Sequence, residues 1–242
     1  MATKKVTTTT TTVVTETIDD GVKRPFHAMI LIDNSGSMAG WQQRVVTGVN
    51  EYVNTLKKSA KEGGFIARVT VQLFDGDFGG NLRIATLRES RDVQEWAPVT
   101  LMEIAPNGST PLYDAVNRAI DYMNRAAGDS DKALVVLTDG GENSSKTAGE
   151  VVRTRIATCQ ASGWLVIYLG ANQDAWNVGG SMGFSAATTS TYTMDNMGVA
   201  FASAARSTAD YASTRSLNAA SFTSAEIAGM SGKKEEEKKK TA

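Results

Sequence analysis

Cysteine and histidine are nearly missing from this sequence of 242 residues, which holds one of each, Cys159 and His27. A single cysteine cannot form an intrachain disulfide, so a disulfide-stapled fold is excluded and nothing indicates an oxidising compartment. The single histidine also limits the enzyme classes that fit. His27 stands at the start of a predicted strand, whereas a catalytic triad built on the serines that follow this strand would need a histidine at its other end.

Long apolar runs and an excess of charge are missing as well. No apolar stretch approaches the roughly 20 residues that a membrane-spanning helix needs. Thr7–Thr12 follow Lys4 and Lys5, where a signal peptide would have an apolar core. The formal net charge is −1, so the chain lacks the basic surface of a general nucleic-acid binder. We therefore expect no membrane or nucleic-acid partner and a cytoplasmic location, with secretion by an unusual route left open.

The two ends of the chain have low-complexity compositions. Residues 1–23 are rich in threonine and offer few groups to bury, which predicts a flexible arm or a strand that orders on a partner. Residues 216–242 include a run of lysine and glutamate at 233–240 and are predicted to form a flexible, solvated tail. A single predicted domain therefore covers residues 24–215.

Within this domain the hydrophobic period alternates. Short apolar runs at 29–32 and 134–137 are typical of strands buried on both faces. Apolar residues recur every three or four positions over 41–56, as in an amphipathic helix. Residues 69–73 and 82–87 flank a glycine-rich turn and predict a hairpin.

The second half continues the alternation. Thr110 is a predicted N-cap, with Pro111 at the first helical position, and Thr147 with Glu150 has the spacing of a capping box. The order of elements predicts an α/β fold: a doubly wound, mostly parallel six-stranded sheet with one antiparallel edge strand and helices on both faces. The remaining predicted elements are strands at 164–169 and 188–193 and helices at 174–182 and 196–211.

Two of the predicted buried strands end in polar clusters. Residues 33–37, Asp-Asn-Ser-Gly-Ser, follow the first, and Asp139 follows a later one. Doubly wound sheets bind ligands beyond the carboxyl ends of their strands, where the strand order reverses. Asp33, Ser35, Ser37 and Asp139 offer hard oxygen ligands, which suit Mg²⁺ or Ca²⁺. Two carboxylates and two hydroxyls leave coordination positions open, so a bound ion can attract an incoming carboxylate.

The pattern Asp-x-Ser-x-Ser after the first strand resembles the metal-ion-dependent adhesion site of the von Willebrand factor type A (vWA) domain. That family completes the site with a threonine from a loop before a helix and an aspartate after the fourth strand. Gly-Ser-Thr-Pro-Leu at 108–112 resembles the second element, and Leu-Thr-Asp-Gly at 137–140 resembles the third. The resemblance covers roughly residues 24–215 and implies five metal ligands: Asp33, Ser35, Ser37, Thr110 and Asp139.

The resemblance also implies how such a site works. In vWA domains the two serines bind the metal directly, the threonine does so in one conformational state, and a partner's acidic side chain can complete the shell. We therefore expect Mg²⁺, with Ca²⁺ or Mn²⁺ as alternatives, and a protein partner that offers an Asp or Glu carboxylate. The expected function is a non-enzymatic, metal-dependent protein–protein interaction (adhesion).

Gly-Ala-Asn-Gln-Asp-Ala-Trp at 170–176 further resembles vWA proteins encoded in bacterial and bacteriophage genomes, which implies a host cytoplasm or a virion as the location. Two other functions stay open. One is a structural or assembly component, for example of a virion, that makes its contacts through the Thr-rich arm. The other is a Mg²⁺-dependent phosphohydrolase with Asp33 as nucleophile, although Ser35 stands where such an enzyme has its second acid. No Gly-Lys-Ser/Thr phosphate loop is present, and Cys159 has no histidine near it.

Overall fold

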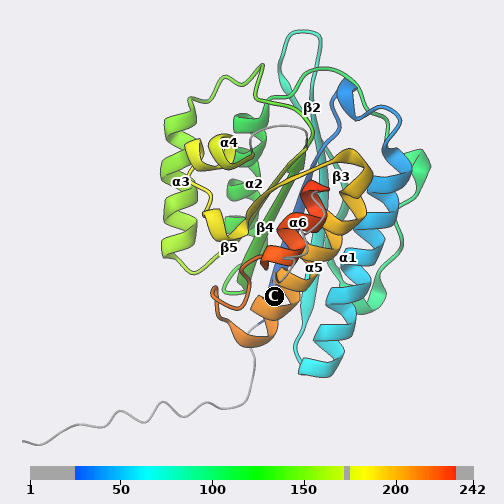
Figure 1. Ribbon diagram of the computed structural model, residues 1–242, viewed down its shortest axis with the longest axis vertical. Helices are drawn as coiled ribbons and strands as arrows, with labels where there is room; N and C mark the ends of the chain where they lie inside the picture. The colour runs from blue at the N-terminus through cyan, green and yellow to red at the C-terminus, as the bar shows by residue number, and fades with distance from the viewer. Residues whose placement is uncertain (1–24, 172–174, 233–242) are drawn as a thin grey trace, which may run out of the picture.

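A single six-stranded sheet forms the middle layer of the computed structural model, which describes residues 25–171 and 175–232 (Figure 1). The strand order is β3-β2-β1-β4-β5-β6. All neighbouring strands are parallel except β2 and β3, which form an antiparallel hairpin at one edge. The predicted sheet and its edge hairpin are therefore confirmed. The strands are β1 (Phe26–Asp33), β2 (Ala67–Gly76), β3 (Leu82–Asp92), β4 (Asp131–Thr138), β5 (Leu165–Ala171) and β6 (Thr189–Tyr192).

The central strand β1 shows why the sheet has helices on both faces. Each of its eight residues is buried. Successive side chains of a strand point to opposite faces, so Ala28, Ile30 and Ile32 enter one core while Met29 and Leu31 enter the other. A strand that is apolar on both faces buries all of its side chains only when a layer of helices covers each face of the sheet.

Helices cover both faces of the sheet (Figure 1). The core that contains Ile30 is closed by α1 (Gln42–Gly63) and α5 (Met197–Thr214), which pack against each other along their lengths. The opposite core is closed by α2 (Leu112–Ala126), α3 (Gly149–Ala161) and α4 (Ala175–Ser181). The helix α3 begins after Ala148, which makes no side-chain cap, so the predicted capping box of Thr147 and Glu150 is wrong. Instead, the Thr147 N–H donates to the carboxylate of Asp114 at 2.8 Å.

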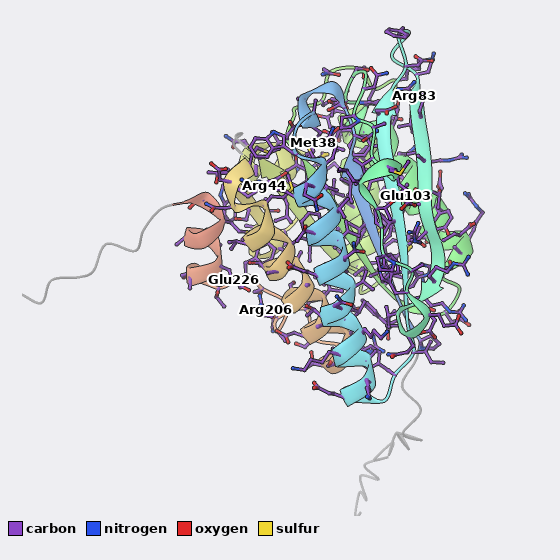
Figure 2. The ribbon with its side chains drawn as sticks, turned by 90° about the vertical axis from the view of Figure 1, so that its right-hand side faces the viewer. Met38, Arg44, Arg83, Glu103, Arg206 and Glu226 are labelled. Atoms are coloured by element: carbon purple, nitrogen blue, oxygen red, sulfur yellow. The ribbon has the colours of Figure 1, made fainter. Side chains whose placement is uncertain are left out.

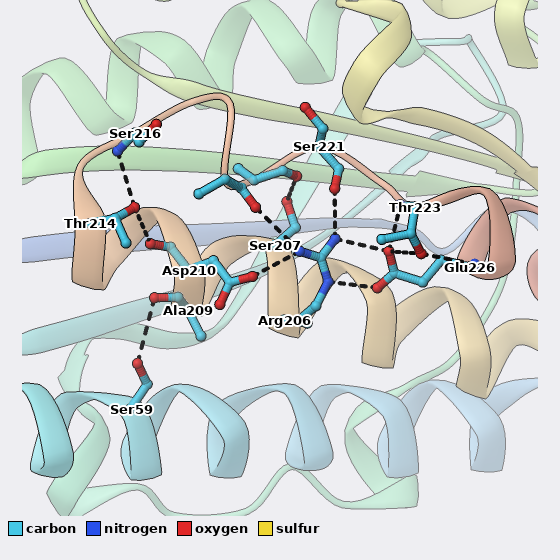
Figure 3. Close-up of polar contacts among 12 residues, drawn as sticks. Ser59, Arg206, Ser207, Ala209, Asp210, Thr214, Ser216, Ser221, Thr223 and Glu226 are labelled. Atoms are coloured by element: carbon cyan, nitrogen blue, oxygen red, sulfur yellow. Dashed lines mark hydrogen bonds and ion pairs between the residues drawn. The ribbon is translucent and has the colours of Figure 1, made fainter.

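The segment after residue 215 differs from the predicted tail. Residues 216–232 are packed on the domain, and they include the helix α6 (Ser224–Ser231) beside β6 and α5. Arg206 on α5 holds this helix through two bonds to the Glu226 carboxylate, at 2.6 and 2.9 Å, and a bond to the Ser221 carbonyl at 2.8 Å (Figure 3). The prediction of a loose tail from 216 is wrong for these residues, because a contact between residues 20 positions apart holds them.

The predicted arm at 1–23 and the charged run at 233–240 lie outside the described residues. Among the helices that the structure describes, none has the length and apolar character needed to cross a membrane.

Candidate metal centre

The candidate ligands lie where the strand order reverses. The chain leaves β1 through α1 to reach β2 on one side, and it leaves β4 through α3 to reach β5 on the other side. The parallel neighbours β1 and β4 therefore end at the same edge of the sheet with their following loops diverging. Asp33 is the last residue of β1, and Asp139 directly follows β4. Asp33 and Asp139 therefore lie together at the edge of the sheet where the sequence predicts them.

Three of the candidate side chains form a short hydrogen-bonded chain. The hydroxyl oxygens of Ser35 and Ser37 are 3.1 Å apart, and the Ser37 hydroxyl donates to Asp139 Oδ1 at 2.7 Å. Two oxygens in adjacent positions around a Mg²⁺ ion, each at about 2.1 Å, would be about 3.0 Å apart. The spacing of these oxygens therefore fits neighbouring positions in one coordination shell.

The other two candidates face the same space across Gly140. A methyl group placed on Gly140 would lie 3.4 Å from Thr110 Oγ1, 3.9 Å from Ser37 Oγ and 4.0 Å from Asp33 Oδ2. Oxygens from two separate loops thus face one point beside Gly140 in a third loop, and glycine leaves that point open. The structure brings all five predicted residues together, while their binding of a metal stays a prediction.

Burial differs between the base and the rim of this cluster. Asp33, Ser35 and Thr110 are 1–3% exposed, whereas Ser37 is exposed and Asp139 is partly exposed. An ion held by the buried oxygens would therefore face solvent on the side of Ser37 and Asp139. This open side is the feature that a bridging contact to another molecule requires.

Neighbouring groups fix the loop of residues 33–37, which follows β1, in place. Thr138, the last residue of β4, donates its hydroxyl to Asp33 Oδ2 at 2.5 Å, and the Ser35 N–H donates to Asp33 Oδ1 at 2.8 Å. Met38 closes the loop by inserting its side chain into the core beside the start of α1 (Figure 2). Both oxygens of the Asp33 carboxylate are therefore oriented by the protein.

Asn143 holds the loop that carries Thr110, just before α2, in place through two hydrogen bonds. The Thr110 N–H donates to Asn143 Oδ1 at 2.8 Å, and the Asn143 N–H donates to the Thr110 carbonyl at 3.2 Å. The helix α2 starts at Leu112 with no side-chain cap from the preceding residue Pro111, so the prediction that Thr110 caps it is wrong. Glu142 caps the first turn of α2 instead, because its carboxylate accepts a hydrogen bond from the Tyr113 N–H at 2.9 Å. The Thr110 hydroxyl is thus left to face Gly140.

The charge balance of the cluster favours a cation. The pKa of Asp33 is raised to about 6, mainly by burial and in part by the charge of Asp139, against the lowering effect of hydrogen bonds from Thr138 and Ser35. Burial also raises the pKa of Asp139. Among the described residues, no lysine or arginine forms an ion pair with either carboxylate. A divalent ion between them would remove this electrostatic penalty.

The donor set is made mostly of hydroxyls. Within the described parts of the chain, no group of three or more His, Cys, Asp or Glu side chains is arranged to hold a metal. The cluster therefore offers two carboxylates with three hydroxyls, which is a set for a hard cation that keeps some of its water. The residues present fit Mg²⁺ or Mn²⁺ better than a soft metal.

The single histidine and the single cysteine of the sequence lie away from this cluster. His27 is buried near the start of β1, at the end of the sheet opposite Asp33, where it bonds with Thr70 Oγ1 at 2.9 Å. Cys159 is buried in α3, and burial raises the pKa of its thiol to about 11. Neither group reaches the serines of the loop at 33–37, so a Ser-His-Asp or Cys-His arrangement is not formed there.

Several known structures have this fold. The open form of the pilus adhesin SpaC from Lactobacillus rhamnosus GG superposes with a TM-score of 0.59 at 12% identity, covering 77% of this chain and 30% of that chain. Proximal thread matrix protein 1 from the mussel byssus gives 0.54 at 16% identity, covering 79% and 49%. Manganese-loaded TRAP protein from Plasmodium vivax gives 0.52 at 15% identity, covering 74% and 72%. At these identities the likeness shows the fold alone.

The sequence itself identifies the family. No curated protein has a significant match to the chain. The chain spans less than a third of the SpaC chain and about half of the mussel protein. The family model of the von Willebrand factor type A domain, however, matches residues 29–206, a span that runs from β1 into α5 and contains all five candidate ligands. The chain therefore belongs to the von Willebrand factor type A domain family.

Proposed function

We propose that this chain is a non-enzymatic protein-interaction module that holds a divalent cation on Asp33, Ser35, Ser37, Thr110 and Asp139. The observation that carries the proposal is the convergence of hydroxyl and carboxylate oxygens from three loops on the open space at Gly140. The ion is Mg²⁺, or Mn²⁺ as in the manganese-loaded TRAP protein, and the site is of the metal-ion-dependent adhesion type.

The partner is a protein that presents an Asp or Glu carboxylate. The buried base of the cluster supplies fixed oxygens, and the exposed side leaves room for one more ligand. A carboxylate is the protein group that a partly neutralised hard cation attracts most strongly. The structural likeness to the pilus adhesin SpaC is consistent with a role in contacts between proteins.

Two alternatives have less support. A phosphohydrolase would need Asp33 as a free nucleophile, but this carboxylate is buried and accepts hydrogen bonds on both oxygens. An assembly role through the arm depends on residues 1–23, which lie outside the described residues, and removal of this arm followed by an assembly assay tests it. A bacterial or bacteriophage origin and a cytoplasmic location stay predictions.

The proposal is tested by thermal unfolding of the full chain in a titration of MgCl₂. A ligand that binds only the native state raises stability, and at ten times Kd the rise is about 1.4 kcal/mol, or about 3–6 °C in Tm for a domain of this size. The double variant Ser35→Ala/Ser37→Ala should show no such rise. A wild-type Tm that does not move at millimolar Mg²⁺ or Mn²⁺ would sink the proposal.

A further inference from the structure

Phe78 is the most exposed large apolar side chain of the described residues, at 102% of its reference area. It lies in the turn between β2 and β3, which projects beyond the end of the sheet in Figure 1. Because β2 is parallel to β1, this is the end at which Asp33 lies. A lone exposed apolar residue needs no explanation by itself, so its role depends on how the turn is held and on what it adjoins.

The turn that carries Phe78 is fixed by its own hydrogen bonds. Asp77 Oδ1 accepts from the N–H groups of Gly79 and Asn81, both at 2.8 Å. The Asp77 N–H donates to the Asn81 carbonyl at 2.9 Å, and the Gly80 N–H donates to the Asp77 carbonyl at 2.9 Å. A ring presented on a fixed turn loses little backbone freedom when it is bound.

The turn is also tied to the loop after Asp139. The Lys146 ammonium donates to Asn81 Oδ1, and Gly80 packs against the side chain of Ser144, since a methyl group on this glycine would lie 3.4 Å from its Cβ. This loop contains Asn143, which clamps Thr110.

A second tie runs through the other candidate loop. Gly76, the last residue of β2, exchanges backbone hydrogen bonds with Ser109 at 2.8 and 3.4 Å. Ser109 directly precedes Thr110, so the hairpin and the candidate ligands form one connected unit. The turn that carries Phe78 is therefore held in a set position relative to the candidate ligands.

We propose that Phe78 is the apolar anchor of the interaction face and that the partner is a protein with an apolar pocket beside its metal-binding carboxylate. This proposal rests on the proposed function. A metal–carboxylate contact alone accepts any accessible Asp or Glu, whereas a buried aromatic ring adds shape selection and contributes strongly at interfaces. Phe78 thus distinguishes the correct partner from other acidic surfaces.

A displayed library tests the proposal. A small three-helix scaffold with one fixed glutamate and randomised residues around it is selected on the full-length chain in Mg²⁺. Most Mg²⁺-dependent binders should carry apolar residues around the glutamate. Their Kd should rise tenfold or more for Phe78→Ala, which is about 1.4 kcal/mol. Met102→Ala is the matched control, because Met102 is 97% exposed but lies on the 3-10 helix η3 (Leu101–Glu103), which packs against α1. The binders should bind this variant with the same Kd as the wild type.

The outcomes separate the two proposals. Binders that need Mg²⁺ and the Ser35 and Ser37 hydroxyls but bind Phe78→Ala with unchanged Kd would overturn the anchor role and leave the metal function standing. Selected binders that all persist in chelator would count against the metal function itself. Binding of wild type, but not Phe78→Ala, to phosphatidylcholine vesicles would assign the ring to a membrane and overturn the protein-partner proposal. Because the Phe78 side chain is fully exposed, its removal should leave Tm unchanged.

Discussion

Gly140 and Gly141 are adjacent residues that the structure places in different surroundings. A methyl group on Gly140 would enter the space between Thr110, Ser37 and Asp33 at ordinary contact distances, whereas one on Gly141 would meet nothing within 4 Å. Gly140→Ala should therefore fold normally and weaken Mn²⁺ binding at least about fivefold, since the methyl group crowds an ion that needs oxygens at about 2.1 Å. Gly141→Ala should bind as the wild type does. Calorimetric titration with Mn²⁺ measures both, and equal affinities for the two variants would contradict the assigned position of the ion.

His27 gives the chain a pH dependence that is independent of the metal centre. Burial, with Arg68 and Lys132 nearby, lowers its pKa from 6.5 to about 4. The unfolded chain therefore binds this proton more tightly, so stability is full above pH 6.5 and falls as the pH drops towards 4, by about 3 kcal/mol for this shift. Asp33 acts in the opposite direction, because its raised pKa favours the folded state as the pH falls below about 6.

The two effects separate by comparison with His27→Gln. From pH 7 to pH 4, the free energy of unfolding of the wild type should fall by about 3 kcal/mol relative to that of the variant, which lacks the imidazole. The effect of Asp33 cancels in this comparison, because both proteins contain it. Urea denaturation at each pH measures it. Parallel pH profiles for the two proteins would show that His27 is not buried in its neutral form.

At the scale of elements, α1 and α5 approach closely at Gly48. A methyl group there would lie 2.1 Å from Cδ2 of the buried Phe201 ring. Alanine normally stabilises a helix by about 1 kcal/mol relative to glycine, but overpacking a core costs about 1–3 kcal/mol. Gly48→Ala should therefore destabilise the fold by up to about 2 kcal/mol.

Gly198 on α5 provides the matched control for this contact. A methyl group on Gly198 would meet nothing within 4 Å, so Gly198→Ala should be neutral or stabilising by up to about 1 kcal/mol. Urea denaturation of both variants gives the comparison. A stabilised Gly48→Ala variant would mean that the two helices are not packed at this distance.

The sequence predicted most elements because their cause is local. The run at 29–32 and the period over 41–56 each indicate a buried surface, and both elements formed. The helix α6 has no such pattern, since its only buried residue is Met230 and its position depends on Arg206 from another helix. The two N-cap predictions are wrong for a related reason. Thr110 and Thr147 are suitable residue types, but their N–H groups donate to Asn143 and Asp114, respectively, which come from distant parts of the chain.

In the molecule as a whole, the candidate residues that directly follow a strand are the ones that the sequence pattern predicts. Asp33, Ser35, Ser37 and Asp139 could be assigned because two apolar runs end at them. The groups that position them could not, because they act across the sheet: Thr138 orients Asp33 from β4. Asn34 likewise joins β1 to other segments by donating to Asp75 and to the Ala105 carbonyl.

Electron paramagnetic resonance of Mn²⁺ can show directly whether one divalent cation binds among the oxygens around Gly140. Bound Mn²⁺ loses the sharp signal of the free ion, so a titration counts the sites on the full-length chain. We expect one bound ion per chain in the wild type and none in Ser35→Ala/Ser37→Ala at the same concentrations. Undiminished binding by the double variant, or no binding by the wild type at millimolar Mn²⁺, would contradict it.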